Sequence, residues 1–119
     1  MKFEVRFYKL PSGKCPVEDF LDTLDHKMRA KILRLVLLLK ENGNDLREPY
    51  SKCLEDGLFE LRVKQGTNIT RVLYFFMIDK EIVITHGFIK KTEKTPRAEI
   101  ELAKKYREDY ISGKESANV

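Results

Sequence analysis

The sequence of 119 residues has little of what membrane-spanning, disulfide-linked or disordered proteins contain in abundance. Its longest uninterrupted apolar run, from Val72 to Ile78, is far shorter than the roughly 20 residues that a membrane-spanning helix needs. Its two cysteines stand far apart and match neither a zinc-binding nor a redox motif, which is typical of reduced thiols. Glycine and proline are scarce, so we expect order everywhere except in a flexible tail over residues 112–119. These absences predict one soluble, cytoplasmic domain over residues 1–111 without a membrane partner.

Several catalytic signatures are missing as well. The sequence shows no Ser/His/Asp arrangement, no glycine-rich phosphate loop and no metal-ligand spacing. Carboxylates near the most cationic segments are limited to Glu60 and Glu93, which are too few for a two-metal phosphoryl-transfer site. We therefore expect neither a metal nor a cofactor, and any phosphate chemistry should depend on the cations of the protein itself.

Three segments have the apolar spacing of helices. Residues 16–24 form a short one, and residues 26–42 form a longer one with Asp25 as its N-cap and Gly43 as the residue that ends it. A third helix should begin at a Thr-Pro start signal and cover residues 96–111.

The other ordered segments alternate apolar and polar residues, as strands do. A first strand lies in residues 2–8, and three more follow residues 44–57, which show no regular pattern. The later strands cover residues 58–64, 69–78 and 81–89, with two connections of hairpin length between them. The order β-α-α-β-β-β-α predicts an α+β fold with a mainly antiparallel, four-stranded sheet, two N-terminal helices and a C-terminal helix.

The helix over residues 26–42 has more than one apolar face. Its core stripe consists of Met28, Ile32, Leu35, Val36 and Leu39. Leu33 and Leu37 lie outside this stripe, so the second apolar face either meets a partner or is covered by another part of the fold. A basic stripe on a further face consists of Lys27, Lys31 and Arg34.

The hairpins fix how the three later strands pair. With residues 65–68 as the first loop, Arg62 lies opposite Arg71, and with residues 79–80 as the second loop, Arg71 also lies opposite Phe88. One face of the sheet then carries Glu60, Arg62, Lys64, Arg71, Leu73, His86, Phe88 and Lys90. The other face, which should pack against helices, carries Phe59, Leu61, Val63, Val72, Tyr74, Phe76, Val83 and Ile89.

Two opposed arginines repel each other, which on a face partly open to water costs roughly a fraction of a kcal/mol. Only Glu60 is close enough on this face to offset Arg62 and Arg71, so the pair indicates a bound anion. The alternative is that each arginine extends into water or pairs with a carboxylate from elsewhere, such as Glu55 or Asp56.

The chain becomes strongly cationic where the last strand ends. Lys90, Lys91 and Lys94 follow the apolar strand within a few residues, and basic residues outnumber acidic ones over residues 57–95. Such a cluster at the mouth of a sheet suggests a phosphate site, whereas the alternative is a solvated, lysine-rich loop.

RNA allows phosphate chemistry without a metal because it carries its own nucleophile, the 2′-hydroxyl group. Attack on the adjacent phosphate would leave a 2′,3′-cyclic phosphate and a 5′-hydroxyl. Arginine clamps phosphate with two hydrogen bonds, and a lysine crowded by other cations can exchange protons near neutral pH. His86 is the usual kind of residue for proton transfer, although it can equally be a hydrogen-bonded residue of the sheet.

Three segments in order carry a resemblance to a known family. They are residues 57–63, residues 70–75, and residues 86–96 together with Glu99, Ile100 and Ala103. They resemble the RelE/HigB superfamily of toxins from toxin–antitoxin systems, and the phage-derived HigB-like branch most closely. The resemblance covers nearly the whole chain and is strongest over residues 57–103. It implies a RelE-like, microbial-RNase-like fold and a ribosome-dependent mRNA endoribonuclease (mRNA interferase) that cuts the codon in the ribosomal A site and inhibits translation.

The resemblance also implies site residues and partners. Family sites use basic residues on the middle strands and after the last strand, which here are Arg62, Arg71, Lys90, Lys91 and Lys94. His86 and Glu60 are candidates for proton transfer. The residues that we expect to contact RNA are Lys64, Lys27, Lys31, Arg34 and Arg97. The expected partners are a helix-turn-helix, HigA-like antitoxin, the ribosome and mRNA, with operator DNA bound only through the antitoxin complex.

Two departures from the family pattern leave the proton-transfer roles open. Some relatives have a tyrosine after the last strand, whereas Tyr106 and Tyr110 lie within the final helix here. Many have lysine where this chain has Glu60, which can act as a base or pair with Arg62. Two other function classes stay open: a ParE-like toxin directed at gyrase, which shares the fold, and a non-catalytic co-repressor or binding module.

Overall fold

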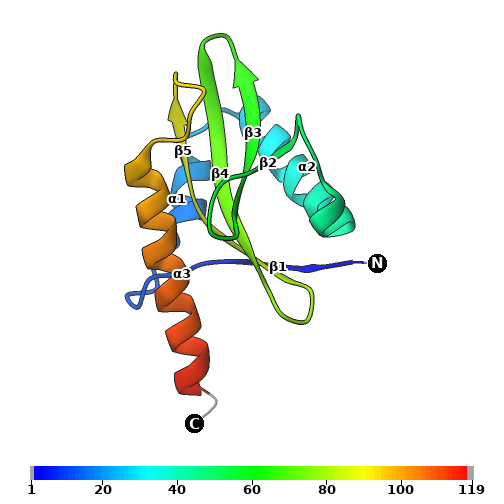
Figure 1. The fold of residues 1–119 in the computed structure, drawn as a ribbon. Helices are drawn as coiled ribbons and strands as arrows, with labels where there is room; N and C mark the ends of the chain where they lie inside the picture. Colours follow the sequence, from blue (N-terminus) through cyan, green and yellow to red (C-terminus); the bar gives the residue numbers. More distant parts are fainter. Residues whose placement is uncertain (1, 118–119) are drawn as a thin grey trace.

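A five-stranded mixed sheet organises the protein (Figure 1). The computed structural model describes residues 2–117. The strands are β1 (Glu4–Phe7), β2 (Ser51–Cys53), β3 (Leu58–Gln65), β4 (Asn68–Met77) and β5 (Glu81–Lys90). They lie in the order β1-β5-β4-β3-β2, with β1 parallel to β5 and all other neighbours antiparallel. Within the described part of the chain, no helix is long and apolar enough to cross a membrane.

Helices cover both faces of the sheet (Figure 1). On one face lie α1 (Pro16–Asp22) and α2 (His26–Asn42), which is followed by the 3₁₀ turn η1 (Gly43–Asp45), and on the other face lies α3 (Arg97–Ala117). The core under α1 and α2 includes Val17, Leu21, Met28, Ile32, Leu39, Leu61, Val72, Tyr74, Ile82 and Ile84. The core under α3 includes Leu58, Leu73, Phe75, Val83, Phe88, Ile100 and Ala103. The sheet is therefore a central layer with little water on either face.

The predicted boundaries of α2 are confirmed. The Asp25 carboxylate accepts a hydrogen bond from the backbone N–H of Met28 at 2.8 Å, which satisfies one of the free amides of the first turn. Gly43 ends the helix with a φ of 52°, and the Phe3 ring lies where a side chain at this position would stand. Glycine is required there for both its conformation and its size.

The sheet differs from the predicted four-stranded, mainly antiparallel one. The sequence predicts the strand in residues 2–8 but not its parallel pairing with β5, which joins segments that are far apart in the chain. It does not predict β2, which pairs with residues 59–61 of β3. β2 has no alternating pattern of its own, and a hydrogen bond between the hydroxyl groups of Ser51 and Tyr74 helps to hold it.

A β-bulge interrupts the pairing of β4 with β5. Leu73 pairs with His86, but the next residue, Tyr74, pairs with Ile84, so that Thr85 is the extra residue. The Thr85 hydroxyl donates a hydrogen bond to the Leu73 carbonyl at 3.2 Å and stabilises the bulge.

The bulge divides the predicted register into a correct half and an incorrect half. Between the bulge and the β3–β4 turn, Arg62 pairs with Arg71 and Arg71 pairs with Phe88, as predicted. On the other side the turn covers residues 78–80 instead of 79–80, and Val83 packs under α3 rather than in the core of α1 and α2.

The last helix is longer than predicted. α3 continues through Gly113 to Ala117, whereas the sequence predicts its end at about residue 111. A single glycine costs a helix only about 1 kcal/mol, which is too little to stop it without a proline or a cap. Residues 112–117 of the tail that we expected to be flexible are therefore helical, and residues 118–119 lie outside the described residues.

Candidate functional site

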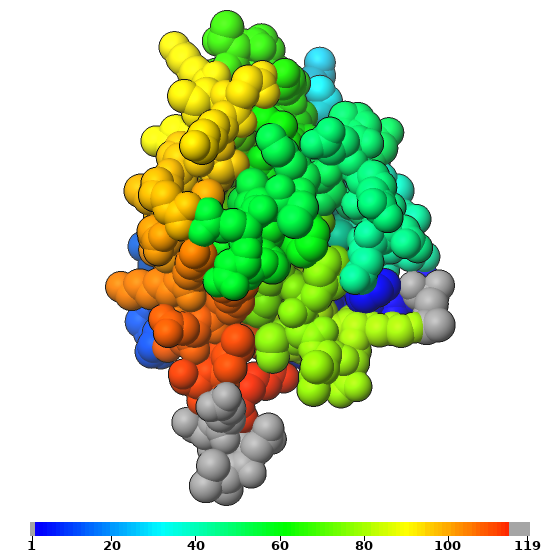
Figure 2. Space-filling view, viewed as in Figure 1, coloured from blue at the N-terminus to red at the C-terminus, as the bar shows by residue number. Residues whose placement is uncertain are grey.

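The cations of β3 meet the segment after β5 at one end of the sheet, where Figure 2 shows the end of β5 in yellow near the green hairpin of β3 and β4. The Arg62 Nη2 atom donates hydrogen bonds to the backbone carbonyl and the carboxylate of Glu93, both at 3.2 Å. The Lys64 ammonium lies 2.7 Å from the other carboxylate oxygen of Glu93. These bonds, first from Lys64 and then from Arg62, lower the pKa of Glu93. A surface carboxylate thus bridges two cations that would suit a phosphate.

Three exposed lysines extend this positive surface. Lys90 ends β5, and Lys91 and Lys94 lie in the loop that follows. Among residues 2–117, none of the three forms an ion pair. We call the five residues Arg62, Lys64, Lys90, Lys91 and Lys94 the cationic end.

Arg71 lies beneath the cationic end and not on it. Its side chain has 0% exposure, in contrast to the partly wet position that the sequence predicts. The guanidinium donates hydrogen bonds to three successive carbonyl oxygens, those of Thr92, Glu93 (2.8 Å) and Lys94 (3.4 Å). Burial lowers the pKa of Arg71, and the Glu60 carboxylate opposes this effect. Arg71 therefore fastens the loop after β5 from inside, and a phosphate on the surface does not reach it.

Glu60 separates the two opposed arginines. Its carboxylate, also with 0% exposure, has Oε2 at 3.2 Å from Arg62 Nε and Oε1 at 3.7 Å from Arg71 Nε. The Thr95 hydroxyl donates a hydrogen bond to Oε1 at 2.8 Å. The charge that relieves the arginine pair thus comes from the same face of the sheet, rather than from Glu55 or Asp56. Of the two roles considered for Glu60, the structure shows the pairing with Arg62.

His86 lies under α3, away from the cationic end. Its Nε2 atom is 3.2 Å from Glu99 Oε1, its Nδ1 atom is 3.1 Å from the Thr85 hydroxyl, and its ring stacks on Phe88. Burial lowers its pKa, although the Glu99 carboxylate acts in the opposite direction. The residue has the environment of a hydrogen-bonded core histidine.

Arg97 has carboxylate partners within the protein. Its guanidinium contacts Glu55 through both terminal nitrogens, one at 2.6 Å, and lies 2.7 Å from Glu101. Lys104 also lies 2.7 Å from Glu55. The hydrogen bond from Arg97 is the main reason why the pKa of Glu55 falls to about 2. Arg97 fastens the start of α3 to the turn before β3.

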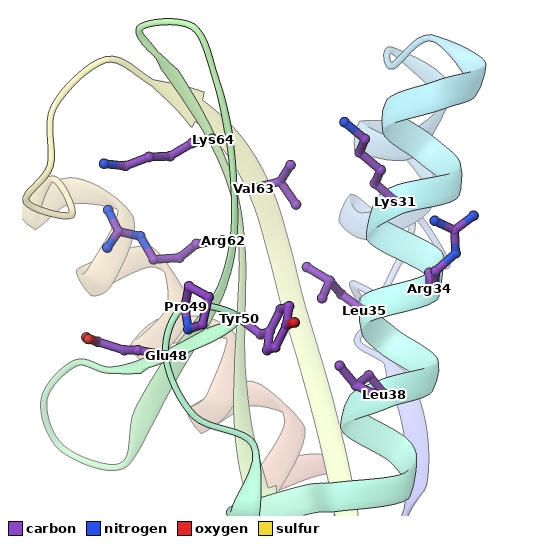
Figure 3. Close-up of a pocket in the computed structure, with 10 residues that line it drawn as sticks. All are labelled: Lys31, Arg34, Leu35, Leu38, Glu48, Pro49, Tyr50, Arg62, Val63 and Lys64. Carbon is purple, nitrogen blue, oxygen red and sulfur yellow. The ribbon is translucent and has the colours of Figure 1, made fainter.

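The basic stripe of α2 is exposed, as predicted, but its members differ in position. Lys31 and Arg34 line a cavity of about 720 Å³ between α2 and β3 (Figure 3), whereas Lys27 does not line it. The second apolar face of α2 is not covered by the fold, since Leu33 and Leu37 are 40% and 63% exposed. No element among the described residues covers this face, so the alternative that remains for it is contact with a partner.

Two parts of the site leave no clear signal in the sequence. Nothing in the irregular segment before β2 indicates Tyr50, which is half-exposed and whose carbonyl accepts a hydrogen bond from the Arg62 N–H at 3.0 Å. The carbonyls of residues 92–94 were also missed, because backbone acceptors leave no trace in a sequence. The only hint in the sequence is that too few carboxylates lie near Arg71 to neutralise it, so that other acceptors are needed.

The site is a group of surface cations, of which Arg62 is only partly exposed, above the buried pair of Glu60 and Arg71, on a small α+β protein with a mixed sheet. Among the described residues, no group of three or more His, Cys, Asp or Glu side chains could hold a metal ion. The arrangement can bind an anion such as a phosphate at the surface and hold the surrounding loop in place from below.

Residues 19–108 match the family described as Phage derived protein Gp49-like (DUF891), and the chain belongs to this family. It is a RelE-like toxin family of toxin–antitoxin systems, which indicates a toxin with an antitoxin as its partner. The matched segment contains every residue that the sequence predicts for the site. No curated protein matches the chain.

Proposed function

We propose that the protein is a HigB-like toxin that cleaves mRNA on the ribosome without a metal and thereby inhibits translation. The observation that carries the proposal is the cationic end, where Arg62 and Lys64 hold one carboxylate between them and three exposed lysines stand nearby. Such a surface suits a substrate with closely spaced phosphates. Membership of a toxin family supports the same conclusion.

In this mechanism the scissile phosphate displaces the Glu93 carboxylate from Arg62 and Lys64. These two cations bind the non-bridging oxygens and stabilise the charge that builds up as the 2′-oxygen attacks the phosphorus atom. One lysine of the loop, from Lys90, Lys91 and Lys94, takes the proton of the 2′-hydroxyl in its uncharged form, and another gives a proton to the departing 5′-oxygen. The products are a 2′,3′-cyclic phosphate and a 5′-hydroxyl.

Arg71 and Glu60 are positioning residues in this account. Arg71 holds the carbonyls of residues 92–94, and Glu60 orients Arg62 through the 3.2 Å contact with its Nε atom. His86 takes no part in proton transfer, because its ring is buried under α3.

The proposed partners follow from the proposed reaction. The ribosomal A site presents an unpaired codon to the cationic end, in the cytoplasm where translation occurs. A helix-turn-helix, HigA-like antitoxin neutralises the toxin, and operator DNA is bound only through the complex of the two proteins.

Primer extension on mRNA from cells that briefly express the protein tests the proposal. We expect discrete cuts inside translated codons, and Arg62→Ala should reduce them by on the order of 10²-fold or more, because it removes a stabilising charge of the transition state. Lys9→Ala, at an exposed lysine beyond the opposite edge of the sheet, is the control and should leave the cuts unchanged.

Other outcomes would support the other function classes. Growth arrest without cuts, accompanied by a DNA-damage response, would indicate a gyrase-directed toxin. Normal growth without cuts would indicate a non-catalytic binding module. Full cleavage by a folded Arg62→Ala protein would show that the site lies elsewhere.

A further inference from the structure

The cavity between α2 and β3 has an apolar interior of a size that suits a small planar group. Its volume of about 720 Å³ lies within the range of ligand sites, roughly 300–1,000 Å³. Its apolar lining consists of Leu35, Leu38, Pro49, Tyr50 and Val63. In Figure 3 the side chains of Leu35, Leu38, Tyr50 and Val63 point toward one another across the gap. Tyr50 is 47% exposed, so part of the residue is open to contact with a ligand.

Cations surround the cavity, and in Figure 3 Lys31 is the one that points toward β3 from α2. Lys31, Arg34, Arg62 and Lys64 line the cavity, against the single carboxylate of Glu48. Figure 3 shows that the Arg62 and Lys64 side chains leave β3 on the side away from α2, whereas Val63 between them points toward α2. The edge of β3 therefore has cations on one side and an apolar cavity on the other.

The cavity is attached directly to the cationic end. The Tyr50 carbonyl accepts a hydrogen bond from the Arg62 N–H at 3.0 Å, so the backbones of the two residues lie side by side. β2 pairs only with residues 59–61, and beyond the Arg62–Tyr50 bond no strand of the described residues pairs with β3 on this edge. A flexible chain can pass over this edge with its backbone on the cationic side and a side group in the cavity.

We propose that the cavity binds one unpaired nucleobase of the RNA substrate, stacked on Tyr50, beside the nucleotide whose phosphate lies on Arg62 and Lys64. Binding sites for single strands combine a cationic track for the backbone with aromatic rings for the bases, and both are present here. An acidic peptide matches the cations around the cavity but gives no reason for an exposed tyrosine whose backbone is bonded to that of a phosphate-binding arginine. The inference rests on the proposed function for the identity of its ligand, RNA.

Binding is tested with protein that contains 3-fluorotyrosine, whose ¹⁹F signals report each of the 5 tyrosines, with Tyr50→Phe to assign the signal of Tyr50. The probe is a short 2′-O-methyl oligonucleotide, which cannot be cleaved. We expect it to shift the Tyr50 signal selectively, while an abasic oligonucleotide of the same length does so much less. Equal shifts with the abasic probe, or a shift with an oligoglutamate peptide and none with the oligonucleotide, would overturn the proposal.

Variants locate the contact. Tyr50→Ala should weaken oligonucleotide binding by roughly tenfold or more, since base–aromatic stacking contributes at that level, whereas Tyr50→Phe should retain it. Leu38→Glu and Leu37→Glu form a matched pair, because both are exposed neighbours on α2 and only Leu38 lines the cavity. Leu38→Glu should reduce binding more than Leu37→Glu, and equal effects would contradict the proposed location.

Cut-site mapping separates this inference from the proposed function. Tyr50→Ala should still cut mRNA but with an altered base preference next to the cleaved bond. Cuts with unchanged preference, together with an unshifted Tyr50 signal, would remove the base site and leave the ribonuclease. A selective Tyr50 shift in a protein that cuts no mRNA would retain a nucleobase site and remove the ribonuclease.

Discussion

At the scale of single residues, one carboxylate explains how the sheet tolerates two opposed arginines. Glu60 lies between Arg62 and Arg71, so the repulsion that the sequence predicts is relieved inside the protein and requires no bound anion. The two arginines consequently have different tasks. Arg62 extends to the surface and contacts Glu93, whereas Arg71 uses its donors on the carbonyls of the loop. These buried charges stabilise the fold only together, because removal of one of them leaves the others in the interior as charges without a partner.

Glu93→Gln should strengthen binding of an uncleavable RNA oligonucleotide. The Glu93 carboxylate occupies Arg62 and Lys64, and the substitution frees both cations while it removes a negative charge. The affinity is measured by fluorescence anisotropy at fixed salt. Glu41→Gln, an equal charge change at an exposed residue that pairs with Lys2, is the control. Weaker binding by Glu93→Gln than by the control would show that Glu93 does not compete with the phosphate.

Arg71→Ala should lower the free energy of unfolding by about 3 kcal/mol or more, since loss of one partner from a buried ion pair typically costs 3–5 kcal/mol. The variant also leaves the carbonyls of residues 92–94 without their donor. Urea unfolding measures the change. The double substitution Glu60→Gln with Arg71→Met removes both buried charges and should recover part of the loss. An Arg71→Ala protein with unchanged stability would contradict the role assigned here.

At the scale of elements, the loop after β5 and the start of α3 are held from several directions. Arg71 binds the loop carbonyls, the Thr95 hydroxyl binds Glu60, and Arg97 binds Glu55 at the turn before β3. The loop lysines therefore stand on a backbone that is anchored at both ends. This order reduces the entropy that must be lost when a substrate binds.

The pairing of Glu55 with Arg97 should stabilise the fold in a pH-dependent way. The folded-state pKa of Glu55 is about 2, below the ordinary value of 4.5, so the stabilisation is fully present above about pH 4.5 and is lost as the pH falls toward 2. Glu55→Gln should therefore have a lower Tm than the wild type at pH 7, and the difference should disappear near pH 2. Glu108→Gln, at an exposed carboxylate of α3, is the control. A difference that is constant over this range would contradict the assignment.

The elements that can be predicted from the sequence are those whose signals are local. The caps of α2, the two-arginine pairing and the cationic loop follow from periodicity, capping residues and hairpin length. The parallel pairing of β1, the short β2 and the bulge at Thr85 depend on contacts between distant segments, and no local pattern records such contacts. Burial of Arg71 was missed for the same reason, because α3 and its preceding loop cover the sheet face only in the folded protein.

At the scale of the whole molecule, the distribution of charge matters more than its sum. The formal net charge is only +4, and several cations away from the site, such as Arg97 and Arg107, are paired with carboxylates. The cationic end keeps three lysines that no carboxylate of the described residues neutralises. A local field of this kind attracts a polyanion and orients it toward one end of the sheet.

RNA binding should depend steeply on salt, because each phosphate contact releases counterions. With about four or five contacts, the logarithm of the affinity should fall with the logarithm of the salt concentration at a slope of about −3 for a single strand. Lys91→Gln should make this slope shallower by about 0.7. Binding isotherms of an uncleavable oligonucleotide between about 50 and 200 mM salt give the slope. A slope near zero would contradict an electrostatic site.

The cationic end should promote attack by the 2′-hydroxyl of ribosome-bound mRNA, and one reconstituted reaction can measure this. Purified protein is added to ribosomes that hold either an all-ribose mRNA or the same mRNA with one 2′-deoxy nucleotide on the 5′ side of the mapped cut. We expect cleavage of the all-ribose mRNA, with 2′,3′-cyclic phosphate and 5′-hydroxyl ends, and none at the substituted position. Equal cleavage of both mRNAs, or no cleavage of either, would contradict it.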